Sequence, residues 1–404
     1  MVINPTFKTV KGMNNRTRDN DVPKGYVRNA VNVIISDSGE VEFTRPGKTP
    51  VYTGNVLWYF EAPFIKLFVE DGDLKRLNAD FTATTLLAAV GNDRMTYTVV
   101  GSSVYFSNWI AQGKVANGAV SEWGVTRPAR QPDCTAVDNG GLFAGDYRVA
   151  ITFIAGSESG TGAGRRVTVV EGGGIHLSNF PAAPGNVTLI AVYVSPVNSR
   201  DMYLYGEYPA TVADVFIGQR ELTVPLTTQF KYPPKPVDII QAHYGRIYYA
   251  VGKYLYWTFD RRYDLQRPYD YWEFDSNVVT VESCPNVLYV QTQHKFYKIV
   301  NIDGDGAPIV EELQNSGATK GSVCVDPDGV SSYFMSARGL IKATPEGLAE
   351  LTYKDVAIPL FGEGATTVIE RNGTKYLVFS GKGGTQNPLA DSGYSAGELV
   401  RGSL

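Results

Sequence analysis

Residues 243–259 read HYGRIYYAVGKYLYWTF, and this stretch decides the fold that we predict for the chain. Apolar residues recur at every second position on both sides of the pair Gly252-Lys253. Two runs of this period, joined by two residues that suit a tight turn, predict a β-hairpin.

The same pattern recurs along the chain, before and after this stretch. It is found in residues 64–77, 94–106, 286–302, 330–343 and 366–379, with predicted turns at Asp71-Gly72, Gly101-Ser102, Thr292-Gln293-His294, Ala337-Arg338-Gly339 and Asn372-Gly373. Hairpins at intervals of roughly 40–50 residues are typical of propeller blades. We therefore predict an all-β fold, an irregular β-propeller.

Two proline-containing linkers, residues 126–132 and 232–236, interrupt the hairpins. The segment between them has short alternating strands and frequent turn residues, which is typical of a fibronectin- or immunoglobulin-like β-sandwich. A module bracketed in this way is expected to be an insertion at an exposed loop of the propeller. The predicted divisions are an N-terminal arm and hairpin (1–50), the first part of the propeller (51–126), the inserted sandwich (127–231) and the second part of the propeller (232–404).

Three local features complete the predicted organisation. Residues 26–35 and 40–44 are predicted as a strand pair that turns at Ser38-Gly39. Residues 112–118 are polar and are predicted as a long loop. Residues 398–400 could supply a last strand to the final blade.

The composition excludes several classes of protein. The chain has 404 residues with 43% hydrophobic content and 25 Tyr, enough for a substantial β-rich core. The formal net charge is -4, whereas dedicated nucleic-acid binders are usually basic. Cys134, Cys284 and Cys324 are too widely spaced to indicate a disulfide framework or a metal cluster. No signal peptide or membrane-spanning run is evident, so no membrane insertion is expected.

Catalytic motifs are scarce. The three histidines, His176, His243 and His294, are not spaced as metal ligands, and neither HExxH nor CxxC occurs. Residues 160–164 read GTGAG but lack the third glycine of a dinucleotide site, so we interpret them as a flexible loop.

One segment matches part of a Ca²⁺-binding loop. Asn301, Asp303, Asp305 and Glu312 occupy ligand positions of that pattern, whereas Ile309 leaves the ninth position without a ligand. The flanking residues are strand-like, so a helix–loop–helix hand is excluded. A polar turn between two strands is the favoured alternative to a Ca²⁺ site.

The aromatic and acidic run at residues 256–275 has three possible roles. It could form a sugar-binding platform in which two of Asp260, Asp264 and Asp270 act as acid and base. Its alternating Trp and Phe residues could instead fill the space between blades, which we favour. The exposed part of the run also suits a protein interface, where Tyr, Trp and Arg are enriched. The predicted interface residues are Tyr26, Arg28, Arg45, Trp257, Tyr269 and Trp272.

Several of these stretches are similar to a known family. Asn14-Asn15 and residues 22–33 (VPKGYVRNAVNV), with Ser38-Gly39 and Arg45-Pro46-Gly47, resemble the opening of tail hub or nozzle proteins of short-tailed bacteriophages. Residues 245–257 resemble a propeller strand pair of that family. Tyr147, Val149 and residues 192–195 resemble its inserted fibronectin-like sandwich.

The resemblance implies a structural virion protein and not an enzyme. It implies a homo-oligomer, commonly a hexameric ring, that continues the DNA channel below the portal and adaptor rings. The implied partners are adaptor or head-to-tail proteins and tail fibre or tip proteins, with genomic DNA as passive cargo. The implied location is the phage tail in the virion, after assembly in the host bacterial cytoplasm. Head-completion plugs have a similar build, so the position along the tail stays open.

The charge balance agrees with passive passage of DNA. Contacts from Lys and Arg to phosphate would add affinity and hold the DNA, which a mildly acidic chain avoids. The alternative function is a carbohydrate-binding or glycoside-cleaving propeller, which would require a carboxylate pair across an aromatic pocket.

Overall fold

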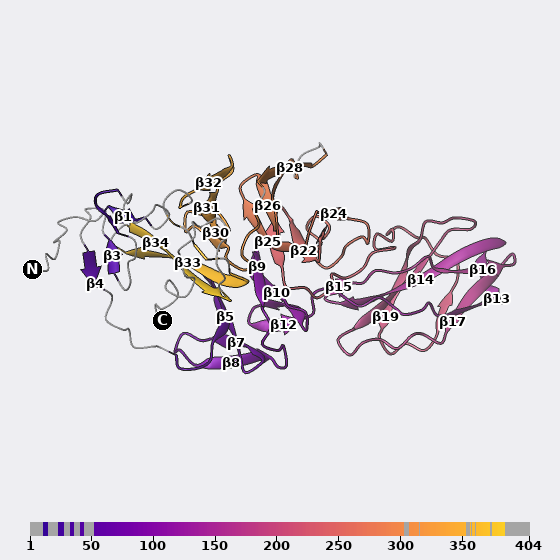
Figure 1. Cartoon of the computed structure of the whole chain (residues 1–404). Coiled ribbons are helices and arrows are strands. Elements are labelled where there is room, and N and C mark those ends of the chain that lie inside the picture. The colour runs from indigo at the N-terminus through magenta and orange to yellow at the C-terminus, as the bar shows by residue number, and fades with distance from the viewer. Residues whose placement is uncertain are drawn as a thin grey trace, which may run out of the picture.

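The computed structural model describes residues 11–14, 23–27, 33–35, 41–43, 52–302, 307–314, 316–352, 356, 358–359, 361–371 and 374–383. Within these residues the regular elements are all β-strands. The strands group into a propeller and a sandwich that extends to one side of it (Figure 1). The chain is therefore an all-β protein, an irregular β-propeller with an inserted β-sandwich, as predicted.

Five propeller blades in the described part of the chain are four-stranded antiparallel meanders. The first blade comprises β5 (Leu57–Ala62), β6 (Ile65–Glu70), β7 (Asp73–Leu77) and β8 (Ala83–Leu87). The second comprises β9 (Thr96–Val100), β10 (Ser103–Ser107), β11 (Gln112–Ala116) and β12 (Ala119–Ser121). The third comprises β21 (Ile240–His243), β22 (Arg246–Val251), β23 (Tyr254–Trp257) and β24 (Tyr271–Glu273). The fourth comprises β25 (Val278–Cys284), β26 (Val287–Thr292), β27 (Phe296–Val300) and β28 (Ile309–Gln314), and the fifth β29 (Cys324–Val325), β30 (Ser332–Ser336), β31 (Gly339–Ala343) and β32 (Leu348–Glu350).

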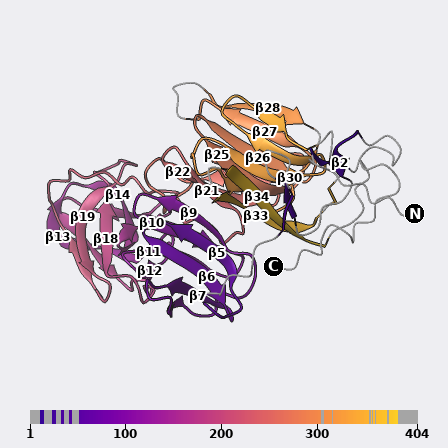
Figure 2. The same cartoon turned by 90° about the vertical axis from the view of Figure 1, so that its left-hand side faces the viewer.

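The first strand of each blade lies nearest the propeller axis. β5 contacts β9, β9 contacts β21, and β21 contacts β25, whereas later strands contact mainly their own sheet. Figure 2 shows these sheets side by side around the axis, with the sandwich beyond the second blade. The insertion therefore leaves the order of the blades around the axis unbroken.

Local turn chemistry explains why the strands pair as they do. Asp71 and Gly72, between β6 and β7, have φ angles of 53° and 80°. Positive φ at both central residues gives a type I′ turn, whose twist matches that of the strands it joins. The same geometry recurs at Asn117 and Gly118, with φ angles of 51° and 76°.

The prediction of a long polar loop at residues 112–118 was wrong. Residues 112–116 form β11, which pairs with both β10 and β12. The pair Asn117-Gly118 is a strong hairpin signal that the prediction did not use. The polar residues in β11 alternate with buried positions, so they belong to a half-buried strand.

The propeller core consists of separate apolar clusters between neighbouring blades. The first and second blades share a cluster that contains Leu67, Leu74 and Phe106. Similar clusters join the second and third blades, the third and fourth, and the fourth and fifth. The second, third and fourth blades therefore bury their two faces against different neighbours, which stabilises the ring of blades.

The sandwich consists of two antiparallel sheets. One contains β13 (Asp133–Leu142), β17 (Gly173–Ser178) and β20 (Val215–Ile217). The other contains β14 (Gly145–Ala155), β15 (Ser157–Glu158), β16 (Arg165–Val169), β18 (Leu189–Val194) and β19 (Tyr203–Pro209). Alternate residues of β14, including Ile151 and Phe153, pack with Ile175 and Leu177 of β17 between the sheets. These strands lie inside the predicted segment 127–231.

The remaining strands form three small sheets. β1 (Gly12–Met13) pairs in parallel with β2 (Tyr26–Val27), and β3 (Val33–Ile35) pairs with β4 (Val41–Phe43). The predicted strand 26–35 is thus divided between two sheets. β33 (Glu363–Arg371) pairs with β34 (Thr374–Lys382). The predicted turns at 38–39 and 372–373 and the predicted strand 398–400 lie outside the described residues.

Candidate functional site

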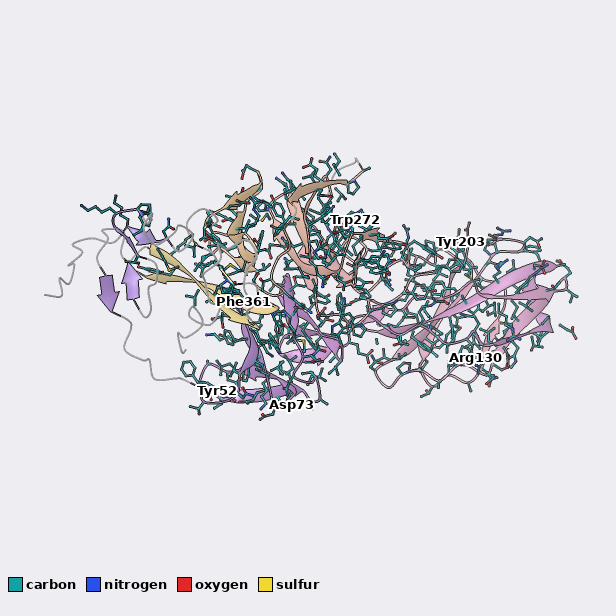
Figure 3. All side chains as sticks on the ribbon, in the orientation of Figure 1. Tyr52, Asp73, Arg130, Tyr203, Trp272 and Phe361 are labelled. Atoms are coloured by element: carbon teal, nitrogen blue, oxygen red, sulfur yellow. The ribbon has the colours of Figure 1, made fainter. Side chains whose placement is uncertain are left out.

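The aromatic run at residues 256–275 contains core residues and surface residues. Trp257 on β23 and Trp272 on β24 have ring centroids 4.3 Å apart. Both are half-buried against the cluster that joins the third and fourth blades. Trp272 is marked in Figure 3, on the third blade. These two predicted interface residues therefore also contribute to blade packing.

The loop between β23 and β24 presents the exposed part of the run. Tyr269 is 85% exposed, and Tyr271 is 38% exposed. Tyr26, another predicted interface residue, is half-buried in β2. Arg28 and Arg45 lie outside the described residues.

The three acidic residues of the alternative catalytic site lie against different neighbours. A Cβ at Gly245 would lie 2.4 Å from Oδ1 of Asp260, so this carboxylate lies against the turn before β22. The backbone carbonyl of Asp264 lies against Gly124. Burial raises the pKa of Asp270, and the nearby cations Arg267, Arg246 and Lys231 oppose that rise.

Cations and an aromatic ring surround the end of the sandwich linker. The ammonium of Lys231 lies 3.8 Å from the centroid of Phe259, and the guanidinium of Arg267 lies 4.9 Å from it. Desolvation lowers the pKa of Lys231, and the neighbouring charges of Arg262 and Arg267 lower it further. The aromatic ring of Phe259 therefore makes two cation–π contacts, with Lys231 and Arg267, whose positive charges repel each other.

These residues belong to a junction that fixes the sandwich to the propeller. We define the junction as linker residues 231–236 together with loop residues 259–267. Tyr232 and Gln266 exchange two backbone hydrogen bonds, with N···O distances of 2.9 and 2.8 Å. The exchange is a β-bridge between the linker and the third blade. The linker is therefore bound to the blade along its backbone.

Side chains reinforce the junction from both units. The guanidinium of Arg127 lies 4.2 Å from the centroid of Tyr232. The indole Nε1 of Trp123 donates to the carbonyl of Tyr263 at 2.8 Å, and Trp123 is almost fully buried. Arg262 donates through Nη1 to Oγ1 of Thr227 at 2.8 Å. The contact between Arg262 and Thr227 joins the sandwich segment to the third blade. The other two join the first linker to the second linker, and the second blade to the third.

Two glycines permit the close approach of chain segments at the junction. A Cβ at Gly160 would lie 1.8 Å from the carbonyl oxygen of Lys231. A Cβ at Gly124 would lie 2.7 Å from Pro233, and the φ of Gly124 is +85°. No larger residue fits at Gly160 without a backbone shift, so the junction depends on glycine there.

The candidate Ca²⁺ loop is only partly visible. Asn301 follows β27 with a φ of 60°, and Glu312 lies on β28, whereas Asp303 and Asp305 lie outside the described residues. Glu312 accepts a hydrogen bond from Nζ of Lys295 at 2.8 Å. Within the described residues, no cluster of three or more His, Cys, Asp or Glu side chains could hold a metal ion.

Ion pairs near the propeller axis were not predicted from the sequence. Arg94, before β9, pairs with Glu363 at the start of β33 at 3.1 Å and also donates to the carbonyl of Gly321. Lys320, before β29, pairs with the buried Asp238, before β21. Partners separated by 269 and 82 positions leave no local pattern, so only the fold brings them together.

The two described cavities lie in the first and second blades. One, of about 350 Å³, is lined by Phe64, Ile65, Arg76, Ser102, Val115, Asn117 and Gly118. The other, of about 340 Å³, is lined mainly by aromatic residues of the first blade. Neither is lined by a carboxylate or by a residue of the 256–275 run. In the part of the chain that the structure covers, no helix is long and apolar enough to cross a membrane.

No protein-family model matches the chain, and neither does any curated protein. Among solved structures, the chain is similar to the extracellular domain of a one-component system from B. thetaiotaomicron, at 10% identity and a TM-score of 0.30. That match covers 80% of this chain and 36% of the other, so the chain spans about a third of its length.

Two β-structures of more similar size also match. The WD40 β-propeller domain of Doa1 is 11% identical with a TM-score of 0.29, and the match covers 80% of this chain and 87% of that one. Sqt1 of Saccharomyces cerevisiae is 9% identical with a TM-score of 0.27, and the match covers 78% and 76%. We draw no function from these similarities, because the identities and TM-scores are low.

Proposed function

We propose that this chain is a structural virion protein of a short-tailed bacteriophage, a tail hub or nozzle subunit. Copies of it would close into a ring, commonly of six, that continues the DNA channel below the portal and adaptor. The ring would retain packaged DNA and pass it at ejection. The role is mechanical and requires no catalytic site.

The junction between the sandwich and the propeller is the observation that carries this proposal. A flexible linker would let the two units move independently, which is the ordinary expectation for domains joined by short polar interfaces. Here the backbone bridge between Tyr232 and Gln266 binds the linker to the third blade, and the hydrogen bond from Arg262 to Thr227 joins the sandwich segment to the same loop. A subunit of fixed shape can form the same interface with the next copy at every position, which a closed ring requires.

The charge of the chain supports the passage of DNA through such a ring. The formal net charge is -4, with 37 Lys and Arg against 41 Asp and Glu. Affinity for DNA depends on the number of phosphates that Lys and Arg neutralise. A slightly acidic subunit should therefore bind DNA weakly, so that DNA is not slowed during ejection.

The mass of the purified full-length protein tests the proposal. Native mass spectrometry at micromolar concentration should give a closed oligomer, and negative-stain images should show a ring with an open lumen. A monomer at every concentration would overturn the proposal. Hydrolysis of a saccharide that is abolished by Asp270→Asn would also overturn it and would favour the glycoside-cleaving alternative.

The need for a fixed junction has its own test. Gly160→Ala places a methyl group against the carbonyl of Lys231 and should reduce ring formation at least tenfold at a given concentration. Gly185→Ala is the matched control, because a Cβ at Gly185 meets nothing within 4 Å. Equal assembly of both variants would show that a fixed junction is not required.

A further inference from the structure

The sheet β33–β34 occupies the place of a sixth blade but differs from the other five. In those blades the second strand, β6, β10, β22, β26 or β30, has at least four buried residues. At the positions of β34 whose burial is described, none is buried. The second strand of a blade is buried because later strands and neighbouring blades cover it, and among the described residues β34 lacks that cover.

Apolar residues on this sheet are left partly open to solvent. Val378 is 40% exposed. Phe379 is half-buried, and its ring is tilted against that of Phe361 with centroids 5.1 Å apart (Phe361 is labelled in Figure 3). No buried apolar cluster includes a described residue of β33 or β34.

The outer edge of β34 is also unpaired in the described part of the chain. β34 pairs with β33 along nine residues, and no third strand follows it in the sheet. Residues 374–382 read TKYLVFSGK, which is rich in residues that favour strands. A long open edge of this composition is a template for pairing with another strand.

The propeller is closed at this point without an added strand. Arg94 and Glu363 form an ion pair between the start of the second blade and the start of β33. The amide of Gly364 donates to the carbonyl of Lys320, before the fifth blade, at 2.8 Å. These contacts connect β33 to the second and the fifth blades, so the described residues close the ring of blades through β33.

The hairpin β3–β4 has the two strands that a four-stranded blade would need beyond β33 and β34. Each of its strands has three residues, as do the outermost strands β12, β24 and β32, whereas the third strands of complete blades have four or five. Its sequences are VII and VEF, and the register pairs Val33 with Phe43 and Ile35 with Val41. A two-stranded hairpin of this apolar sequence would complete a two-stranded blade as a four-stranded sheet.

Within one chain the hairpin and β34 belong to separate sheets. We propose that the β3–β4 hairpin of a neighbouring copy adds to the open edge of β34 and completes its sixth blade. This rests on the proposed function, because it requires copies arranged in a ring. Each subunit would then give one hairpin and receive one, a head-to-tail contact that closes by rotation.

Cysteine crosslinking between co-expressed copies tests the proposal. One copy carries Glu42→Cys, the other carries Val378→Cys, and a short bis-maleimide joins thiols that lie close together. Val310→Cys replaces Val378→Cys in the control, because Val310 is 41% exposed on β28, the outer strand of a complete blade. Crosslinked heterodimers should be at least tenfold more abundant with Val378→Cys than with Val310→Cys.

The outcomes separate this inference from the proposed function. An oligomeric wild-type protein with equal crosslinking at Val378 and Val310 overturns the inference alone. Crosslinking only within one copy carrying both Glu42→Cys and Val378→Cys also overturns it. A monomeric wild-type protein overturns both proposals.

A second measurement uses no substitution and so does not depend on the folding of a variant. A synthetic peptide of residues 31–45 should compete for the edge of β34 and convert the wild-type oligomer to smaller species. A peptide of the same composition in scrambled order is the control. An oligomer that is unchanged by excess peptide, together with equal crosslinking in the cysteine experiment, would overturn the inference.

Discussion

The fourth blade and the sheet β33–β34 both begin with an antiparallel pair of strands, but in the described part of the chain only the fourth blade has two further strands. In the fourth blade every residue of β26 is buried, because β25 and β27 flank it and neighbouring blades cover both faces. In the other sheet β34 has, within the described part of the chain, one partner strand and no buried residue. Strand sequences of similar apolar content therefore reach very different burial. The difference teaches that a blade is stabilised by its neighbours more than by its own hairpin.

The largest expected loss of stability comes from replacing a phenylalanine by alanine, once in a complete blade and once in β34. Phe334 is fully buried between the fourth and fifth blades and stacks on Phe296 at 5.0 Å, whereas Phe379 on β34 is half-buried. Phe334→Ala should lower the free energy of unfolding by about 3–5 kcal/mol, and Phe379→Ala by about 1 kcal/mol. Urea denaturation of the two variants measures both values. Equal losses would show that β34 is already covered in the isolated subunit.

The second-largest expected effect on stability comes from a buried carboxylate of the fourth blade, and this effect depends on pH. Glu282 on β25 is 2% exposed and accepts a hydrogen bond from Oγ of Ser332 at 2.9 Å. Burial raises its pKa to about 7. The folded state therefore holds a proton that the unfolded state releases at lower pH. Its contribution to stability is fully present below pH 4.5 and is lost as the pH rises through 7.

Glu282→Gln should remove this dependence. Relative to wild type, the variant should gain roughly 3 kcal/mol of stability between pH 4.5 and pH 8, from the size of the pKa shift. Urea denaturation across that pH range measures the gain. Glu311→Gln, on the exposed outer strand β28 of the same blade, is the control. A difference in the free energy of unfolding between Glu282→Gln and wild type that stays constant with pH would contradict the raised pKa of Glu282.

The smallest effect concerns the contact that holds the incomplete sheet to the rest of the propeller. Arg94 is 17% exposed in its pair with Glu363, whereas Lys66 is 42% exposed in its pair with Glu61. Arg94→Ala should cost about 1–2 kcal/mol, because a partly buried carboxylate loses its partner. Lys66→Ala, the control, should cause no measurable change, since exposed pairs contribute little. Thermal melts of both variants would contradict this account if their midpoints were equal.

The hairpins were predictable because each depends on residues within a short window. Asp71-Gly72 and Gly252-Lys253 mark turns whose flanking strands alternate, and both turns are where the sequence predicted them. The strand β11 was missed because its polar residues were taken for a loop, although Asn117-Gly118 marked the turn after it. Period and turn chemistry therefore account for strand pairs within a blade.

Contacts between blades were not predictable in the same way. The ion pair of Arg94 with Glu363 and that of Lys320 with Asp238 join residues that share no local pattern. Packing between blades was the favoured role of the alternating Trp residues, and Trp257 and Trp272 confirm it, but alternation alone does not say which blade covers each face. Such features depend on the ring of blades, which places distant segments side by side.

Hydrogen exchange tests the contrast between complete and incomplete blades most directly. The amides of β26 and β34 would be compared in the dissociated subunit and in the assembled oligomer. We predict slow exchange in β26 in both states, and exchange in β34 that is fast in the subunit and slow after assembly. Exchange in β34 as slow as in β26 in the dissociated subunit, or unchanged by assembly, would contradict the account.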